Sequence, residues 1–333
     1  MTLLRYLGWG VIFLLVAGFV AWGGLVLWFT VPLGDWLRLA LALGLALLGL
    51  GGFFLVALRG KWLSLLPWAL GTVAILAWWA AIEPRNDRDW VVEVSRLPRV
   101  EIEGDLVTLH NVRNFTYRSE SDFDPRWEVR KLDLRQLDSL DLIAVYWMGD
   151  AIAHTMLSFG FAGEQVAISI EIRKERGESY STIAGFFRQY ELAYVVADER
   201  DLIGLRTTYR QSGEDVYLYR VEAPQANIRQ LFLEYVRKIN ELHERPAFYN
   251  TGTTNCTTNI ITHVRAFNAQ FPFSWKTLLS GYFPELIYER GSLNQELSYP
   301  ALRAQSLINE RARAADGRSD FSRLIREGLP GME

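Results

Sequence analysis

The stretch AWWAAIEPRNDRDW, residues 77–90, separates two unlike parts of the chain. Before it, residues 1–82 carry few charged side chains, namely Arg5, Asp35, Arg38, Arg59 and Lys61. After it, Arg, Asp and Glu are frequent to the end of the sequence. A composition that changes this abruptly predicts two regions in different surroundings, the first apolar enough for a lipid bilayer. We therefore expect a transmembrane domain at 1–82 and a polar domain at 83–333.

Three apolar segments, at about 7–29, 37–58 and 63–82, make up the first region. Each is close to the ~20 residues that a helix needs to cross a bilayer. A cleaved signal peptide has one shorter apolar core, so three successive segments do not fit it. Tryptophans at the segment ends fit the membrane interface. Three membrane helices are therefore expected, and buried helices of a soluble protein are the alternative.

The few charges of the first region predict its orientation. Arg5 precedes the first segment, and Arg59 with Lys61 follows the second, which places both sites in the cytoplasm by the positive-inside bias. The loop with Asp35 and Arg38 is neutral. An odd number of spans then puts everything after residue 82 outside the cytoplasm. The formal net charge of −3 argues against nucleic-acid binding.

The second region predicts an α+β domain with a mainly antiparallel sheet. Residues 165–173 alternate so that Ser169 and Glu171 share one face, opposite Val166 and Ile168. Other stretches of strand character are 100–103, 107–112, 142–147, 192–196 and 216–221. Apolar residues at helical spacing predict an amphipathic helix at 226–243, and residues 301–315 are also helical in pattern.

The only cysteine, Cys256, lies in NTGTTNCTTNIITHV, residues 250–264. Thr254 or Asn255 is a good N-cap for a helix over 257–267, which places Cys256 in the first turn. Unpaired amides and the helix dipole there favour a thiolate and lower the pKa of the thiol from its free value of about 8.5. The alternative is a small buried hydrophobic residue, because a lone cysteine cannot form an internal disulfide.

A thiolate nucleophile usually works with a nearby imidazole. His263 follows on the same helix, roughly 10 Å along the axis, which is too far for a hydrogen bond. His243 lies on a charged helix end, and His110 could face either way. His154 has the most suitable setting, because the next strand offers Ser169 or Glu171 to orient it.

Two alternatives to this catalytic interpretation remain. His154 could be a structural histidine, and Glu171 could simply pair with Arg118 or Arg173. No metal-ligand spacing, phosphate loop or G-x-S-x-G elbow occurs, so no metal and no cofactor is expected. Thiol chemistry is therefore the strongest catalytic hypothesis.

Several motifs resemble, in order, those of the Lnb-type periplasmic domain family, which is linked to bacterial lipoprotein N-acylation. They are NVRNFTYR (111–118), YWMG (146–149), IAHTMLSFGF (152–161), SIEIRKERGE (169–178), FYNT (248–251), NCTTN (255–259) and DFSRLIREGLP (320–330). The resemblance implies a permuted papain-like (NlpC-like) fold, with the histidine strand before the cysteine helix. It also implies Cys256 as nucleophile, His154 as general base, and a bacterial inner membrane protein with a periplasmic catalytic domain.

The resemblance further implies an acyltransferase that forms a Cys256 thioester and acylates diacylated lipoproteins, with a phospholipid or a lipoprotein glyceride as donor. A membrane-tethered cysteine hydrolase and a non-catalytic scaffold are the alternatives. Asn255, Thr257, Arg118, Tyr117 and Tyr146 are candidates for substrate or oxyanion contacts. Lipid contact is suggested for Trp90, Phe186 and Phe187, and phosphate contact for Arg113, Arg118 and Arg126. The oligomeric state is not predicted.

Overall fold

The computed structural model describes residues 2–210, 213–272 and 274–332. The chain forms two compact units. The helical unit comprises Met1–Arg85 together with Tyr180–Tyr190, and the sheet unit comprises Asn86–Ser179 and Glu191–Glu333. The sequence predicted a division at residue 82, but it did not predict that the short segment Tyr180–Tyr190 joins the helices.

The helical unit contains three long apolar helices, as predicted. They are α1 (Thr2–Thr30), α2 (Asp35–Arg59) and α3 (Leu66–Ala81), and α3 is preceded by the 3-10 turn η1 (Trp62–Leu65). The stretches Tyr6–Thr30, Asp35–Arg59 and Trp62–Ala81 are each long and apolar enough to cross a membrane. The side chain of Arg5, on which the predicted orientation partly depends, lies outside the described part of the structure.

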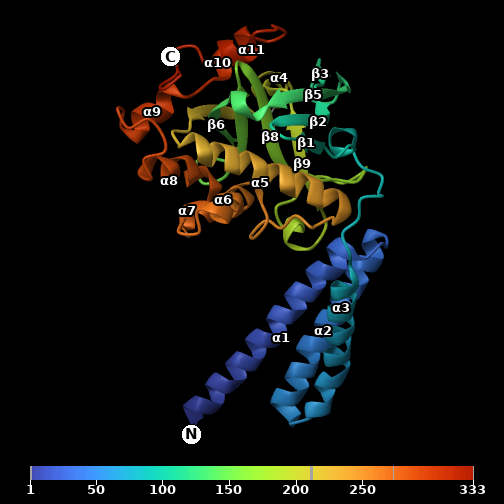
Figure 1. The fold of residues 1–333 in the computed structure, drawn as a ribbon. Helices are drawn as coiled ribbons and strands as arrows, with labels where there is room; N and C mark the ends of the chain where they lie inside the picture. Colours follow the sequence, from blue (N-terminus) through green and yellow to red (C-terminus); the bar gives the residue numbers. More distant parts are fainter. Residues whose placement is uncertain (1, 211–212, 273, 333) are drawn as a thin grey trace. The chain divides into compact units, whose positions relative to one another are not determined.

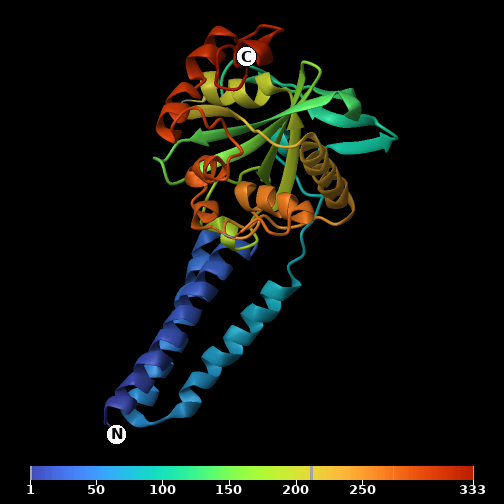
Figure 2. The same ribbon diagram turned by 60° about the vertical axis from the view of Figure 1, so that its left-hand side comes forward.

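Close packing within the helical unit depends on small residues. A Cβ atom on Gly52 would lie 2.7 Å from the carbonyl oxygen of Ser64, so only glycine allows α2 to approach η1 this closely. The Ser64 hydroxyl donates a hydrogen bond to the Gly52 carbonyl oxygen at 3.1 Å. Contacts of this kind are typical of helices that pack within a membrane, where small residues let backbones come together. Figure 2 shows α1 and α2 running side by side.

The sheet unit is built on an eight-stranded sheet in the order β1-β2-β9-β8-β7-β6-β10, with β5 pairing β2. All these pairs are antiparallel except the short β2–β9 contact. The predicted α+β class with a mainly antiparallel sheet is therefore confirmed. The strands are β1 (Arg99–Glu103), β2 (Leu106–Arg113), β5 (Trp127–Asp133), β6 (Leu137–Tyr146), β7 (Ala153–Phe161), β8 (Glu164–Arg173), β9 (Glu191–Ala197) and β10 (Asp215–Arg220). A separate hairpin joins β3 (Thr116–Tyr117) and β4 (Phe123–Asp124).

Helices cover both faces of this sheet (Figure 1). Val166, Ile168 and Ile170 of β8 share one buried apolar cluster with residues of α5 (Gln225–Glu244) and α6 (Cys256–Phe267). Ala167 belongs to the cluster on the other face, with residues of α4 (Glu199–Gly204), α10 (Asn309–Ala314) and α11 (Phe321–Leu324). The remaining helical elements are η2 (Val92–Val94), η3 (Leu134–Gln136), η4 (Ala184–Phe186), η5 (Leu205–Tyr209), α7 (Trp275–Leu278), η6 (Ser280–Tyr282), α8 (Phe283–Glu289) and α9 (Tyr299–Gln305).

The prediction of one continuous helix over 301–315 is wrong. The structure has α9 and α10 separated by residues 306–308, which run along the edge strand β10. The Leu218 amide donates to the Ser306 carbonyl oxygen, and the Ile308 amide donates to the Val216 carbonyl oxygen, each at 2.9 Å. An edge strand needs partners for its backbone groups. Residues 306–308 supply such partners to β10, and they are therefore not helical.

Candidate active site

The candidate site lies where strands β7 and β8 separate. Their pairing ends at Met156 and Ser169. Beyond that pair, His154 on β7 pairs only with Val145 of β6, and Glu171 on β8 pairs only with Ala193 of β9. Continued pairing would have placed His154 opposite Glu171, on the same face of the sheet. The strands thus open just where the predicted histidine and its candidate partners lie.

Cys256 is the first residue of α6. Asn255 caps this helix: its side chain accepts from the Thr258 amide at 2.9 Å, and the Thr258 hydroxyl accepts from the Asn255 amide at 2.9 Å. Cys256 is buried, with 7% of its surface exposed. Cys256 belongs to the buried apolar cluster on this face of the sheet, and its sulfur lies 3.8 Å from the Thr257 hydroxyl. A nucleophilic thiol and a small buried hydrophobic residue therefore both stay interpretations of this position.

His154 is held from one side by a chain of hydrogen bonds. The Ser169 hydroxyl donates to Glu171 Oε1 at 2.6 Å, so the proton between Ser169 Oγ and His154 Nε2, which are 2.7 Å apart, belongs to the imidazole. Nε2 also lies 3.2 Å from Glu171 Oε1. The charges of His154 and Cys256 each shift the pKa of the other group, so the imidazole and the thiol lie near one another.

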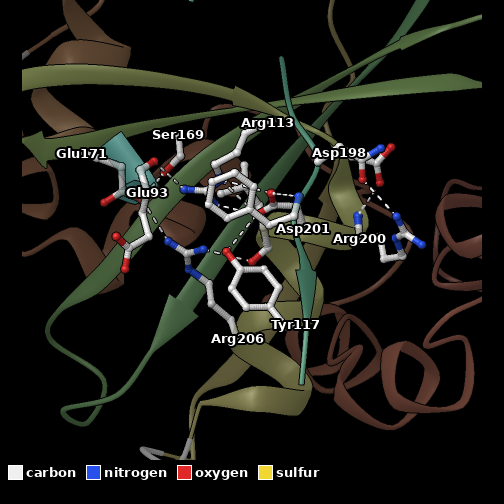
Figure 3. A network of polar contacts seen from close by, with 12 residues as sticks. Glu93, Arg113, Tyr117, Ser169, Glu171, Asp198, Arg200, Asp201 and Arg206 are labelled. Carbon is white, nitrogen blue, oxygen red and sulfur yellow. Dashed lines mark hydrogen bonds and ion pairs between the residues drawn. The ribbon is translucent and has the colours of Figure 1, made fainter. Parts of the chain in front are cut away.

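Arg206 completes the chain behind Glu171. Its Nη2 donates to Glu171 Oε1 at 3.0 Å, and its Nη1 donates to the Leu202 carbonyl oxygen at 2.9 Å. The side chain is buried and belongs to η5, a π-helical turn that continues α4. Short π-helical segments are rare and often occur at functional sites. Figure 3 shows Arg206 reaching toward the strand that carries Ser169 and Glu171.

The charges of these groups support one another. Burial alone would lower the pKa of His154, but the negative charges of Glu171 and Cys256 outweigh it and raise the pKa to about 9. Burial would raise the pKa of Cys256, and the His154 charge and hydrogen bond instead lower it to about 7. Despite its burial, the pKa of Glu171 is held well below its usual range by His154 and Arg206. Near neutral pH this arrangement favours a thiolate–imidazolium pair.

A second buried ion pair adjoins this group (Figure 3). Arg113 Nη2 lies 2.6 Å from Asp201 Oδ1. Asp201 also accepts from the Phe115 amide at 2.7 Å and from the Tyr117 hydroxyl at 3.3 Å. Arg113 is thus buried and already paired, so it is not available for the predicted contact with a phosphate group. Through these bonds Asp201 attaches the start of the small hairpin β3–β4 to α4.

The start of β7 is fixed by a close backbone contact. The Ala153 amide donates to the Ser280 hydroxyl at 3.0 Å, and the Gly281 amide donates to the Ala151 carbonyl oxygen at 3.0 Å. A Cβ atom on Gly281 would come within 2.0 Å of the Asp150 carbonyl oxygen. The Tyr146 hydroxyl donates to the Gly281 carbonyl oxygen at 2.6 Å. Together these contacts fix the position of Ala153, the residue before His154.

The other predicted contact residues have structural partners. Asn255 caps α6, and Thr257 is buried with its hydroxyl 3.0 Å from that of Thr155. Tyr117 and Tyr146 have the partners given above. Arg118 is exposed and bound to Asp122 and Asp124, at 2.6 Å each. The structure therefore brings Cys256, His154, Ser169 and Glu171 together, whereas substrate roles for Arg118, Tyr117 and Tyr146 stay predictions.

Two residues of the site were missed by the sequence analysis. Thr155 follows the predicted histidine directly, so its closeness to the thiol could have been expected once His154 was chosen. Arg206 offered no comparable signal, because only the fold places a residue of η5 behind Glu171. Among the residues that the structure describes, no group of three or more His, Cys, Asp or Glu side chains is arranged to hold a metal ion.

Comparison with known proteins identifies one family. Residues 123–281 match the family model described as the Lnb N-terminal periplasmic domain. This range contains Cys256, His154, Ser169, Glu171 and Arg206. No curated protein and no solved structure matches the chain. The histidine strand precedes the cysteine helix, as the resemblance implied, but the likeness to papain-like folds stays a prediction.

Proposed function

Because residues 123–281 belong to the Lnb N-terminal periplasmic domain family, we propose that this chain is a membrane-bound thiol acyltransferase. Its substrates in this proposal are diacylated bacterial lipoproteins, whose lipidated N-terminal cysteine receives an acyl chain on its free amine. The observation that carries the proposal is the series of contacts from His154 through Ser169 and Glu171 to Arg206, with Cys256 near enough to His154 for each charge to shift the pKa of the other. A structural histidine needs no such series, whereas a thiol nucleophile does.

In the first step, the Cys256 thiolate attacks an ester carbonyl of a phospholipid or of a lipoprotein glyceride. A carbon–sulfur bond forms and the ester carbon–oxygen bond breaks, which leaves a thioester on Cys256. The His154 imidazolium gives its proton to the departing alkoxide, so a lyso-lipid leaves as a neutral alcohol. The backbone amides of Cys256 and Thr257, at the start of α6, are suited to stabilise the tetrahedral oxyanion.

In the second step, the α-amine of the lipoprotein attacks the thioester. An amide bond forms, the carbon–sulfur bond breaks, and the neutral His154 takes the proton that the amine loses. Glu171, held by Arg206, stabilises the imidazolium that results. The amide is more stable than the ester that is consumed, so the transfer needs no ATP.

The proposed location follows from the two units. The region that matches the family model of a periplasmic domain follows three apolar helices that are long enough to cross a membrane. We propose that these helices lie in the bacterial inner membrane with the N-terminus in the cytoplasm. Both substrates keep their acyl chains in the bilayer, so an anchored enzyme would meet them at its surface.

Intact-mass analysis tests this function directly. Full-length protein in lipid nanodiscs is incubated with phospholipid, and the expected result is one added acyl mass that hydroxylamine removes. The Cys256→Ser variant, as matched control, gains no such mass. Absence of any adduct on the unaltered protein would refute the thioester step.

The alternative, a membrane-tethered cysteine hydrolase, uses the same Cys256–His154 pair but lets water resolve the thioester. The two functions differ in their product. When a diacylated lipopeptide is added to acylated protein, transfer gives an N-acylated peptide, whereas hydrolysis gives free fatty acid. Fatty acid as the sole product would overturn the acyltransferase proposal and leave the thiol chemistry intact.

A further inference from the structure

The segment Tyr180–Tyr190 belongs to the helical unit, although it lies between two strands of the sheet unit. The chain leaves β8 at Arg173 and enters β9 at Glu191. The segment, YSTIAGFFRQY, contains no carboxylate and one cation. It includes the short 3-10 turn η4 (Ala184–Phe186). An apolar connection of this kind between two buried strands has no evident role within the sheet itself.

Phe187 anchors the segment among the helices. Its ring stacks on Phe29 of α1 at a centroid distance of 5.7 Å, and it meets the edge of Trp79 of α3 at 6.2 Å. Phe187 is buried in one apolar cluster with Val26 and Ile75. The two ring contacts are with residues near the C-terminal ends of α1 and α3, and the cluster also includes Leu45 of α2. The segment therefore docks where these two helices end.

Arg188 makes the second attachment. Its guanidinium donates to the Trp79 carbonyl oxygen at 2.6 Å and to the Ile82 carbonyl oxygen at 3.1 Å. It also lies 4.8 Å from the centre of the Trp79 ring. The last carbonyls of a helix have no partners within it, and a cation there also suits the helix dipole. The backbone of Arg188 is left-handed, with φ of 53°, a conformation that side chains seldom adopt and that these contacts hold in place.

Three other large side chains of the segment are exposed. Tyr180 is 53% exposed, Ile183 is 55% exposed and Phe186 is 46% exposed. Three neighbouring exposed apolar or aromatic side chains on one short segment form a patch that needs a partner. The ends of membrane helices lie at the bilayer surface, where aromatic residues such as Trp78 and Trp79 are favoured. A segment fixed to those ends meets lipid.

We propose that Tyr180–Tyr190 is an interfacial segment that inserts Ile183 and Phe186 into the outer leaflet of the lipid bilayer, with Phe187 and Arg188 fixing it to α1 and α3. Its partner is the lipid surface, and the aromatic ring of Tyr180 lies at the headgroup level. The proposal rests on the apolar helices and their contacts, and it holds whether or not Cys256 forms a thioester.

The segment also has a consequence for the candidate site. It continues the strand that carries Ser169 and Glu171, and the residues from Glu171 to Tyr180 span at most about 30 Å when fully extended. Insertion of the segment therefore limits how far β8 can move from the lipid surface. If the segment Tyr180–Tyr190 were a lid or bound a second protein, it would not need to be attached to the ends of α1 and α3 by Phe187 and Arg188.

Spin labelling of the full-length protein tests the proposal. Since Cys256 is the only cysteine, Cys256→Ser gives a cysteine-free background. Ile183→Cys and Phe186→Cys are made in it, labelled with a nitroxide and reconstituted in phosphatidylcholine–phosphatidylglycerol vesicles. Collision rates with oxygen, which partitions into lipid, and with a water-soluble nickel complex are then measured. We expect an oxygen-to-nickel ratio at both positions about fivefold above that of an aqueous site.

Two matched controls calibrate this ratio. Val129→Cys, on β5, is 56% exposed in the sheet unit, and Leu47→Cys, on α2, is 75% exposed in the middle of a membrane helix. Ratios at residues 183 and 186 equal to that of Val129 would overturn the proposal. Exclusion of both reagents would overturn it as well, because it would indicate contact with protein. Phe187→Ala is expected to lower the ratio at residue 186 toward the aqueous value.

Discussion

Two histidines, the partly buried His154 and the buried His263, are held in opposite protonation states near neutral pH. His154, beside the thiol at the start of helix α6, has Glu171 within reach through Ser169, and its pKa is raised to about 9. His263, on the helix itself, has the Tyr194 hydroxyl 2.7 Å from its Nε2 and the Tyr235 ring at a centroid distance of 4.5 Å. Burial, with smaller effects of Arg237 and Lys238, lowers the pKa of His263 to about 3.

The difference shows what burial does and what a carboxylate adds. Removal from water disfavours the charged imidazole in both cases. Only His154 has anions, Glu171 and Cys256, close enough to reverse the effect. A phenol, as beside His263, gives a hydrogen bond but no charge. The catalytic hypothesis therefore depends on the anionic partner of the histidine as much as on the histidine itself.

Removal of the His154 imidazole should have the largest effect, and removal of the His263 imidazole is the matched control. His154→Gln deletes the base and the charge that stabilises the thiolate, so the rate of Cys256 acylation should fall about a thousandfold. His263→Gln should change this rate by less than about threefold, because its imidazole bonds to the Tyr194 hydroxyl and is not part of the series through Glu171. Time-resolved intact-mass analysis measures both variants. Equal losses would remove the distinction on which the account depends.

Removal of the anion should have the next largest effect. Glu171→Gln keeps the shape of the side chain but not its charge, so acylation should slow about a hundredfold and the pKa of His154 should fall. The alkaline limb of the pH–rate profile should then move from near 9 to lower pH.

Glu199→Gln is the matched control for this prediction. Glu199 is also a buried carboxylate, but it pairs with Arg326 and accepts from Ser158 at 2.6 Å, away from the thiol. Its loss should lower the melting temperature and leave the limbs of the profile in place. A shift of the alkaline limb in Glu199→Gln, and none in Glu171→Gln, would reverse the assignment.

Arg206 should have a smaller effect, because it acts through Glu171. Arg206→Met leaves the carboxylate without its charged partner, and acylation should slow about tenfold. Arg206→Lys keeps the charge and should recover part of the rate. The pH–rate profile separates a positioning role from simple loss of folding, since only the former moves its limbs. Identical profiles for Arg206→Met and the unaltered protein would remove Arg206 from the site.

The smallest effect concerns stability, where the two histidines should have opposite signs. His263 is charged below pH 6.5 when unfolded but stays neutral down to about 3 when folded, so stability falls as the pH falls below 6.5. This amounts to about 2 kcal/mol at pH 5. His154 has a raised pKa, so its contribution is present below 6.5 and is lost as the pH rises through 9.

Thermal unfolding at pH 5 and pH 7 measures the His263 effect. His263→Gln should lose less stability between the two values than the unaltered protein does. His243→Gln, which changes an exposed histidine, is the control and should behave like the unaltered protein. The same acid sensitivity in all three proteins would show that His263 does not titrate as described.

Local patterns predicted much of the fold and part of the candidate site. The alternation over 165–173 placed Ser169 and Glu171 on one face, and the N-cap pattern placed Cys256 at the start of a helix; β8 and α6 have both features. Neither pattern predicts that β7 and β8 separate, because the separation depends on the pairing of β7 with β6 and of β8 with β9.

Long-range features were not predictable in this way. Arg206 reaches Glu171 only because η5 covers that face of the sheet, and no spacing in the sequence relates the two. The break between α9 and α10 comes from the need of β10 for an edge partner. Likewise, Tyr180–Tyr190 has the composition of an ordinary loop, and its place among the helices follows from Phe187 and Arg188.

The ionisation of the single thiol tests the central claim most directly. The ultraviolet absorbance of the thiolate is followed against pH as the difference between the full-length protein and its Cys256→Ser variant, in which the tyrosine signals cancel. The account predicts a thiol pKa of about 7, with a higher value in His154→Gln. A pKa at or above the free value of about 8.5, unchanged by His154→Gln, would contradict it.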